Sequence, residues 1–252
     1  MQWTLFRGTQ SPVLPPDAYD AMFMEQALAL AERGRGRTSP NPLVGALVVD
    51  EAERDSAGLP RILSAGYHAR PGSAHAEVDA LRKLDGRAPQ KTLYVTLEPC
   101  NHVGRTGRCT DAILAAGLRR VVVGSADPNP RVEGGGIARL RRAGVEVTAF
   151  VLESRCQKQN RGYLRWLRDG RPHLLLKAAM SLDGKLALTQ PGPRGAPLWL
   201  TSALARRRAH VLRDRCDAIL VGAGTVSADD PQLNVRLPAA ERRDDYQPLR
   251  VV

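Results

Sequence analysis

The sequence predicts an α/β fold made of two units in series. Short apolar runs alternate with segments whose apolar residues recur at helical spacing along most of the chain. Hydrophobic residues make up 43% of the 252 residues, enough for a core, and a second alternating unit begins near Arg171. We expect a flexible tail over 1–16, a first domain over 17–152, a connector over 153–170 and the first part of a second domain over 171–252.

Each expected element of the first domain has a local signal. Asp17 can cap a helix that runs to Arg33, and Gly34 then ends it. A second helix is expected just after His75, because Ala80, Leu81 and Leu84 recur at helical spacing there. Further helices are expected over 110–116 and 137–143. Strands are expected over 43–49, 61–68, 92–97, 120–124 and 145–150.

Composition narrows the classes of function. The formal net charge is +11, but the arginines are scattered and aromatic residues make up only 4% of the chain. A nucleic-acid surface would show a basic stripe with interleaved aromatics, so a solvated arginine-rich surface is favoured. No apolar run approaches the roughly 18 to 20 residues that span a bilayer, and the N-terminus does not resemble a signal peptide. We expect a cytoplasmic protein without a membrane partner.

Four cysteines favour a reducing compartment over a disulfide framework. Cys100 and Cys109 together with His75 can hold a tetrahedral zinc ion if water takes the fourth position. Cys109 opens a short helix, where the helix dipole favours the thiolate form. Cys156 and Cys216 are expected to be inert. The sequence therefore predicts zinc as a cofactor, bound by one imidazole and two thiols.

Glu77 is the predicted catalytic residue beside this zinc. A carboxylate next to a zinc-bound water is the general acid and base that hydrolysis needs. Residues two apart on a regular helix point about 200° away from each other, so His75 and Glu77 can share a site only at a helix start. A non-catalytic zinc-stabilised module is the alternative, and it would have a fourth protein ligand, for which His102 is the candidate.

The order of these motifs resembles the zinc-dependent nucleobase deaminases, whose signature is His-x-Glu followed by Pro-Cys-x-x-Cys. Here the longer segment 101–108 separates the cysteines, and it resembles the deaminase domain of the bifunctional riboflavin-biosynthesis deaminase/reductase. Gly107-Arg108 stands where that family usually has two prolines, and Arg105 where it commonly has lysine. The flanking motifs that carry the resemblance are 38–45, 66–68, 94–100 and 127–130.

The resemblance implies a cytidine-deaminase-like α/β/α layered first domain. It implies hydrolytic deamination of 2,5-diamino-6-ribosylamino-4(3H)-pyrimidinone 5′-phosphate, with Asn41, His68, Arg105 and Asn129 around this substrate. On spacing alone, Asn41 and Asn129 are equally well explained as turn residues. A tRNA or nucleoside deaminase is the nearest alternative, disfavoured by the long loop between the cysteines and by the second domain. A homo-oligomer stays open.

The second domain shows weaker signals. We expect a strand over 173–179, a basic helix ending at Arg215, a buried strand over 217–221 and a small-residue loop over 222–225. A last strand begins at Leu249, where the chain stops. On its own this is another α/β unit with a weak nucleotide signal.

The resemblance identifies this second unit with a dihydrofolate-reductase-like, NADPH-dependent reductase domain. Pro197 replaces a serine expected to contact its substrate. We expect the domain to be incomplete, because the family's later glutamate contact and glycine-rich cofactor loop are absent, so NADPH is a cofactor only if this half functions. The implied cofactor-site residues are Ala187, Trp199, Thr225 and Asp229, and the implied substrate-site residues are Arg213, Leu233 and Arg236.

Overall fold

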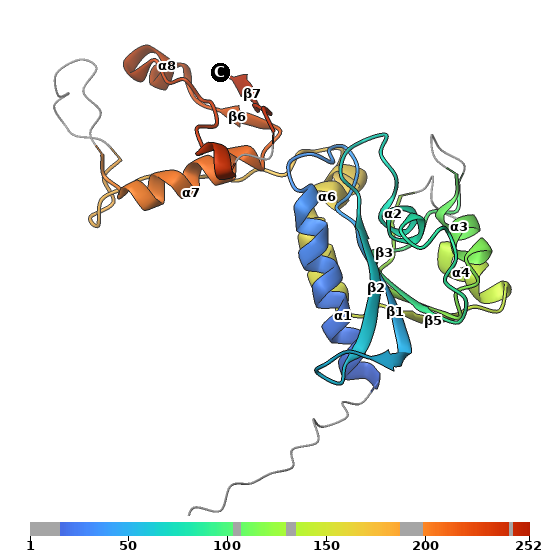
Figure 1. Cartoon of the computed structure of the whole chain (residues 1–252). Helices are drawn as coiled ribbons and strands as arrows, with labels where there is room; N and C mark the ends of the chain where they lie inside the picture. The colour runs from blue at the N-terminus through green and yellow to red at the C-terminus, as the bar shows by residue number, and fades with distance from the viewer. Residues whose placement is uncertain (1–15, 103–106, 130–134, 187–198, 242–243) are drawn as a thin grey trace, which may run out of the picture. The chain divides into compact units, whose positions relative to one another are not determined.

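The chain divides into two compact units, Met1–His173 and Leu174–Val252. The predicted tail over 1–16 lies almost entirely outside the described residues, which begin at Pro16. A computed structural model describes residues 16–102, 107–129, 135–186, 199–241 and 244–252 (Figure 1).

A five-stranded sheet forms the centre of the first unit, with the strand order β2-β1-β3-β4-β5 (Figure 1). β1 pairs antiparallel with both β2 and β3, whereas β3, β4 and β5 run parallel to one another. The carboxyl ends of β3, β4 and β5 therefore meet at one edge of the sheet, where α/β proteins place ligands. The strands are β1 (Gly45–Arg54), β2 (Pro60–Tyr67), β3 (Thr92–Leu97), β4 (Arg120–Ser125) and β5 (Glu146–Ala149).

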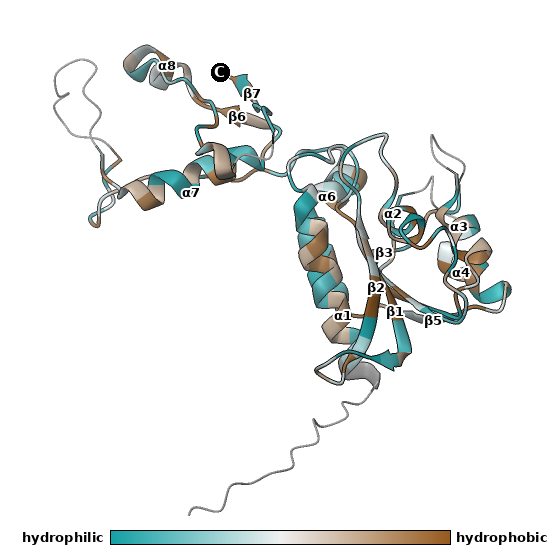
Figure 2. Cartoon of the chain, viewed as in Figure 1, coloured by the Kyte–Doolittle hydropathy of each residue, from teal (hydrophilic) through white to brown (hydrophobic). Residues whose placement is uncertain are grey.

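Helices cover both faces of this sheet, so the unit has three layers. Every side chain of β3 is buried, and successive side chains point to opposite faces. Leu93 and Val95 join one core cluster with α2, α3 and α4, while Tyr94 joins another with α1 and α5. Apolar and polar residues alternate along α1 (Figure 2). The helices are α1 (Pro16–Ala31), η1 (Glu32–Gly34), α2 (Ala76–Arg82), α3 (Cys109–Ala115), α4 (Gly136–Arg142), α5 (Glu153–Gln159) and α6 (Arg161–Asp169).

The β1–β2 turn (residues 55–59) lies far from the carboxyl end of β3. β1 runs on to Arg54, beyond the strand predicted over 43–49, and the side chain of Asp55 accepts from the backbone N–H groups of Ala57 and Leu59, both at 2.9 Å. Because β1 is antiparallel to β3, its later residues lie beside the first residues of β3. The turn is exposed and points away from the edge where the parallel strands end.

Gly66 on β2 allows α2 to lie directly on the sheet. A Cβ atom at this position would be 2.3 Å from the carbonyl oxygen of Ala76 and 2.4 Å from the backbone nitrogen of Ala80. Both are helix backbone atoms, which cannot rotate out of the way. Since Ala76 directly follows His75, this close contact sets where the start of α2 sits relative to the sheet.

We expect Gly66→Ala to lower the free energy of unfolding by about 1–3 kcal/mol, because a methyl group would force α2 off the sheet. Urea unfolding followed by circular dichroism measures this change. Gly162→Ala on α6 is the matched control, since a Cβ there meets only the Cβ of His173, at 3.6 Å. The control should unfold at the same or a higher urea concentration. An unchanged midpoint for Gly66→Ala would contradict the close contact.

The segment 153–170, predicted as a connector, folds as α5 and α6 and belongs to the first unit. Cys156 on α5 is fully buried in the core cluster shared with α1. A Cβ at Gly124 of β4 would lie 2.4 Å from the Cys156 sulfur, so helix and strand are in close contact. Burial raises the pKa of the Cys156 thiol to about 12, which keeps it neutral.

The second unit contains a two-stranded parallel sheet of β6 and β7 within its described residues. The helix α7 begins after Ser202, whose hydroxyl accepts from the backbone N–H of Ala205 at 3.3 Å. In the described parts of both units, we find no helix long and apolar enough to cross a membrane. The elements of this unit are α7 (Ala203–Asp214), β6 (Ala218–Leu220), α8 (Ala223–Asp229), η2 (Ala239–Glu241) and β7 (Leu249–Val251).

Three predictions for the second unit are wrong. The strand predicted to be buried over 217–221 forms as β6, but its side chains are exposed or only partly buried, with Leu220 73% exposed, because β7 pairs with its backbone and leaves its faces uncovered by described residues. The segment 173–179 forms no strand, and Leu174 and Leu176 in it are 79% and 94% exposed. An extended segment becomes a strand only when a neighbouring strand takes up its backbone hydrogen bonds, and no described strand pairs with this one. The small-residue segment 222–225 is the beginning of α8, with Gly222 as its N-cap residue. Glycine has low helix propensity, so the sequence of this segment predicted a loop where the structure has a helix.

Candidate metal centre and active site

His75 and Glu77 lie at the start of α2. His75 is the N-cap residue of this helix, with an extended backbone (φ −68°, ψ 158°). Because the backbone changes direction at this cap, the side chains of His75 and Glu77 can both reach Cys109. His75 Nδ1 lies 3.1 Å from Cys109 Sγ, and the Glu77 carboxyl hydrogen-bonds the same thiol. The predicted placement of this pair at a helix start is therefore what the structure shows.

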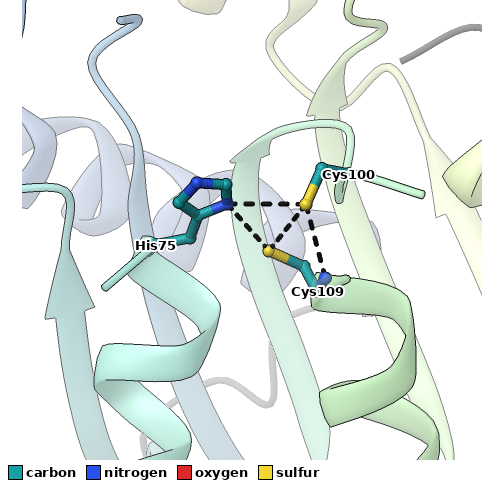
Figure 3. Close-up of side chains that lie close together, drawn as sticks. All are labelled: His75, Cys100 and Cys109. Carbon is teal, nitrogen blue, oxygen red and sulfur yellow. Dashed lines mark hydrogen bonds between the residues drawn. The ribbon is translucent and has the colours of Figure 1, made fainter. Parts of the chain in front are cut away.

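The two thiols come from different elements. Cys100 follows the carboxyl end of β3, and Cys109 is the first residue of α3. The sulfur atoms lie 3.2 Å apart, and Cys100 Sγ lies 3.5 Å from His75 Nδ1. The three possible ligand atoms are all within 4.8 Å of one another. Figure 3 shows the imidazole and both sulfurs pointing toward one another.

This geometry fits a zinc ion. Zinc–sulfur and zinc–nitrogen bonds of about 2.3 and 2.0 Å place two ligands of a tetrahedral ion about 3.5 Å apart. The separations of 3.1 to 3.5 Å between the three ligand atoms need only a small adjustment to admit the ion. The hydrogen bond with Cys109 and the contact with His75 lower the pKa of Cys100, whereas the bond with Cys100 and burial raise the pKa of Cys109, contrary to the expectation from its place at a helix start. Cys100 is therefore ready to bind metal as a thiolate.

Among the described residues, only these three form a group able to hold a metal. His102, the candidate fourth ligand of a non-catalytic zinc module, is not part of the group. Three protein ligands leave one coordination position for water, which is the pattern of catalytic zinc sites. The geometry thus favours the catalytic interpretation over the structural one.

Glu77 is a buried carboxyl beside the group and is not one of its ligands. Its relative exposure is only 3%, and this burial, together with the charge of Cys100, raises the pKa of Glu77 to about 7. A group with a pKa near the working pH can both accept and release a proton efficiently. Its environment therefore suits a proton carrier.

Asn41 and His68 form a hydrogen-bonded pair next to the group. With a proton on Nδ1, His68 donates to the Ala74 carbonyl oxygen at 3.2 Å, and its Nε2 then accepts from the Asn41 amide at 3.0 Å. Burial lowers the pKa of His68, which favours this neutral form. The His68 ring meets the His75 ring edge-on, with 5.6 Å between centroids. The structure thus brings these two predicted substrate residues to the metal group.

Two family models match the chain. Residues 18–125 match the cytidine and deoxycytidylate deaminase zinc-binding region, and residues 172–252 match the RibD C-terminal domain. The riboflavin biosynthesis protein RibD of Aquifex aeolicus (strain VF5) is 44% identical over 233 residues, covering 92% of this chain and 61% of that protein. The RibD protein of Escherichia coli (strain K12) is 43% identical over 241 residues, covering 92% and 62%. The chain is thus similar to RibD proteins along nearly all of its length.

A solved structure agrees with this similarity. The diaminohydroxyphosphoribosylaminopyrimidine deaminase/5-amino-6-(5-phosphoribosylamino)uracil reductase of Thermotoga maritima is 38% identical, with a TM-score of 0.80, over 93% of this chain and 63% of that chain. The predicted fold class, a cytidine-deaminase-like α/β/α unit followed by a dihydrofolate-reductase-like unit, is confirmed. The chain spans about three fifths of the RibD proteins it matches, since the two curated relatives are covered to 61% and 62%.

Asn129, a substrate residue implied by the RibD resemblance, is held by partners that the sequence did not indicate. Its side-chain amide donates to the Tyr163 hydroxyl at 3.4 Å, and Tyr163 donates to the Asp127 carboxyl at 3.1 Å. The Asp127 carboxyl also accepts from the backbone N–H of Asn129 at 3.0 Å, which completes this trio. Tyr163 lies on α6, and no local pattern connects it with residue 129.

Asn160 is a second residue that the sequence analysis missed. It lies between α5 and α6, is 4% exposed, and hydrogen-bonds both backbone groups of Leu43, each at 2.8 Å. These bonds fix the segment that leads from Asn41 into β1. A single asparagine in a polar stretch gives no signal of this role. Arg105, the remaining predicted substrate residue, lies outside the described residues.

The second unit brings its predicted substrate residues together. Arg213 donates to the Asn234 carbonyl oxygen at 3.1 Å, and the Arg236 side chain donates to the same residue's side chain at 2.5 Å. Burial and the charge of Arg236 lower the pKa of Arg213. Leu233, which directly precedes Asn234, is buried and has a positive φ of 49°. Two cations are thus held close together, an arrangement that favours an anionic ligand.

The predicted cofactor residues of this RibD-type unit are less closely grouped. Trp199 lies under the guanidinium of Arg206, 4.3 Å from its ring centroid. Thr225 and Asp229 lie in the first turn and at the last position of α8. Ala187 and the substituted Pro197 lie outside the described residues. A cofactor site formed by these residues stays a prediction.

Proposed function

We propose that this chain catalyses the zinc-dependent hydrolytic deamination of 2,5-diamino-6-ribosylamino-4(3H)-pyrimidinone 5′-phosphate in riboflavin biosynthesis. One observation carries the proposal: three ligand atoms converge beside a buried carboxyl that is not itself a ligand. Similarity to the RibD proteins supports this substrate, and the similar Thermotoga maritima protein is named a diaminohydroxyphosphoribosylaminopyrimidine deaminase.

The reaction exchanges an exocyclic amino group for an oxygen and consumes one water. His75, Cys100 and Cys109 would hold zinc, which when bound lowers the pKa of a coordinated water toward neutrality. Glu77 takes a proton from the water that attacks the ring carbon. Glu77 then gives this proton to the departing amino group, which leaves as ammonia. A pKa of about 7 allows Glu77 to perform both transfers near neutral pH.

The neighbouring polar residues would orient the ring. His68 is fixed by its bond to the Ala74 carbonyl, and it in turn fixes the Asn41 amide. Asn129 is fixed by Tyr163 in the same way. Side-chain amides offer both donors and acceptors, which match the mixed donors and acceptors of a diaminopyrimidinone. Arg105 completes the proposed set of substrate contacts.

Ammonia release from this phosphorylated diaminopyrimidine tests the proposal. The purified chain should release ammonia, lose this activity with a strong zinc chelator, and regain it when zinc is added back. Deoxycytidylate, cytidine and tRNA run in parallel separate the proposal from the tRNA or nucleoside deaminase. Ammonia release that is indifferent to the chelator, or from the nucleoside or tRNA alone, would contradict the proposal.

An NADPH-dependent reductase is the second candidate function, and it concerns the second unit. The match of residues 172–252 to the RibD C-terminal domain favours it, as does the pairing of Arg213 and Arg236 around Asn234. Binding of NADPH to this chain, followed by the fluorescence of the nicotinamide, tests this candidate independently of ammonia release.

A further inference from the structure

The helix α4 contacts the metal-binding segment although it lies beyond residues 18–125, which match the zinc-binding region. A Cβ at Gly136 would be 1.9 Å from the carbonyl oxygen of Pro99, the residue before Cys100. The backbone N–H of Ile137 donates to the Glu98 carboxylate at 3.1 Å. The first turn of α4 is therefore packed directly against the end of β3 that carries Cys100.

Arg139, one turn further along α4, contacts the residues that follow both cysteines. Its Nη1 donates to Asn101 Oδ1 at 2.8 Å and to Thr110 Oγ1 at 2.9 Å. The Thr110 hydroxyl itself donates to Asn101 Oδ1 at 3.1 Å. The second terminal nitrogen, Nη2, forms an ion pair with Asp111. One side chain thus joins the loop after Cys100 to the first turn of α3.

We propose that Arg139 is a positioning residue that holds Cys100 and Cys109 at the separation zinc requires, and so raises zinc affinity without touching the ion. The proposal rests on the metal site of the proposed function. Thr110 is fully buried and the Arg139 side chain is only 28% exposed, so their contact is partly shielded from water and strengthens the link to the start of α3. A planar guanidinium suits this role because its donors diverge at fixed angles toward several acceptors.

The reason for such a clamp lies in the charge of the ligands. Zinc binds thiolates, and two adjacent thiolates repel each other in a buried site. Without a support behind them, the Cys100 loop and α3 can move apart and widen the site. Residues that orient metal ligands from behind typically change metal affinity by 10–100-fold when they are replaced.

Zinc affinity measured by competition with a chromophoric chelator tests the proposal without any substrate. Arg139→Met keeps much of the aliphatic stem but removes the donors, and it should weaken zinc binding by about 10–100-fold. Arg142→Met is the matched control, because Arg142 is an exposed residue at the end of the same helix. The control should bind zinc as tightly as the wild-type protein.

A second variant guards against misfolding of the first. Thr110→Val removes the acceptor and leaves Arg139 in place, and it should also weaken zinc binding. The double variant Arg139→Met/Thr110→Val should lose less affinity than the sum of the two, because both changes break one network. If both single variants bind zinc as tightly as the wild-type protein, Arg139 is not a positioning residue, although the metal site itself stands. A wild-type protein that binds no zinc would overturn the metal site itself.

Discussion

Glu77→Gln should slow ammonia release by at least about 10²–10⁴-fold, the usual contribution of a general acid and base. Glutamine is nearly the same size as glutamate and fits the same buried space, but it cannot accept the proton of the attacking water. Because Glu77 is not among the ligand atoms, the variant should keep its zinc. Turnover and bound zinc are measured on the same sample.

Asp79→Asn provides the control for this change. Asp79 lies on the same helix, and its carboxylate pairs with Lys83 at a partly exposed position. The same chemical replacement there should leave turnover near that of the wild-type protein. If Glu77→Gln turns over substrate as fast as Asp79→Asn while holding zinc, Glu77 is not the proton carrier.

Cys109→Ser should empty the metal site and abolish activity with it. A serine hydroxyl does not ionise near neutral pH as a thiol does, so the set of ligands falls from three to two. The loss of affinity should exceed the roughly 100-fold that changes behind a ligand can produce. Elemental analysis after dialysis gives the zinc bound per chain.

Cys216→Ser is the matched control for the cysteine series. Cys216 is a free, partly buried thiol in the second unit and lies outside the metal-binding group. Its replacement should leave the zinc content unchanged. Full zinc occupancy in Cys109→Ser would show that the ligand assignment is wrong, whatever the activity of that variant.

The metal group could be predicted from sequence because each member carries a local signal. His75 and Glu77 precede a helical repeat, Cys100 follows shortly after an apolar run, and Cys109 opens a short helix. These boundaries place side chains at element ends, where the structure indeed finds them. Local sequence patterns do not show which distant segments come into contact in the fold. Tyr163 reaches Asn129 across 34 positions and Asn160 reaches Leu43 across 117.

The fold of the first unit could also be predicted from local sequence signals. The fold of the second unit could be predicted less completely. The strand β3 is rich in β-branched and apolar residues and its side chains are all buried, and its extent matched the prediction residue for residue. The run over 173–179 is also rich in apolar residues, but no strand in the described part of the chain pairs with it. Strand formation depends on a neighbour, and a neighbour is a property of topology that composition does not contain.

The β1–β2 turn has a practical consequence for anyone handling the protein. It is exposed, its own backbone is held by Asp55, and it sits at the end of the sheet remote from the two thiols. Loops of this kind tolerate insertions, because few buried contacts are disturbed. A fluorescent dye or an affinity peptide introduced between residues 55 and 59 would provide an attachment point for immobilisation that leaves the chemistry untouched.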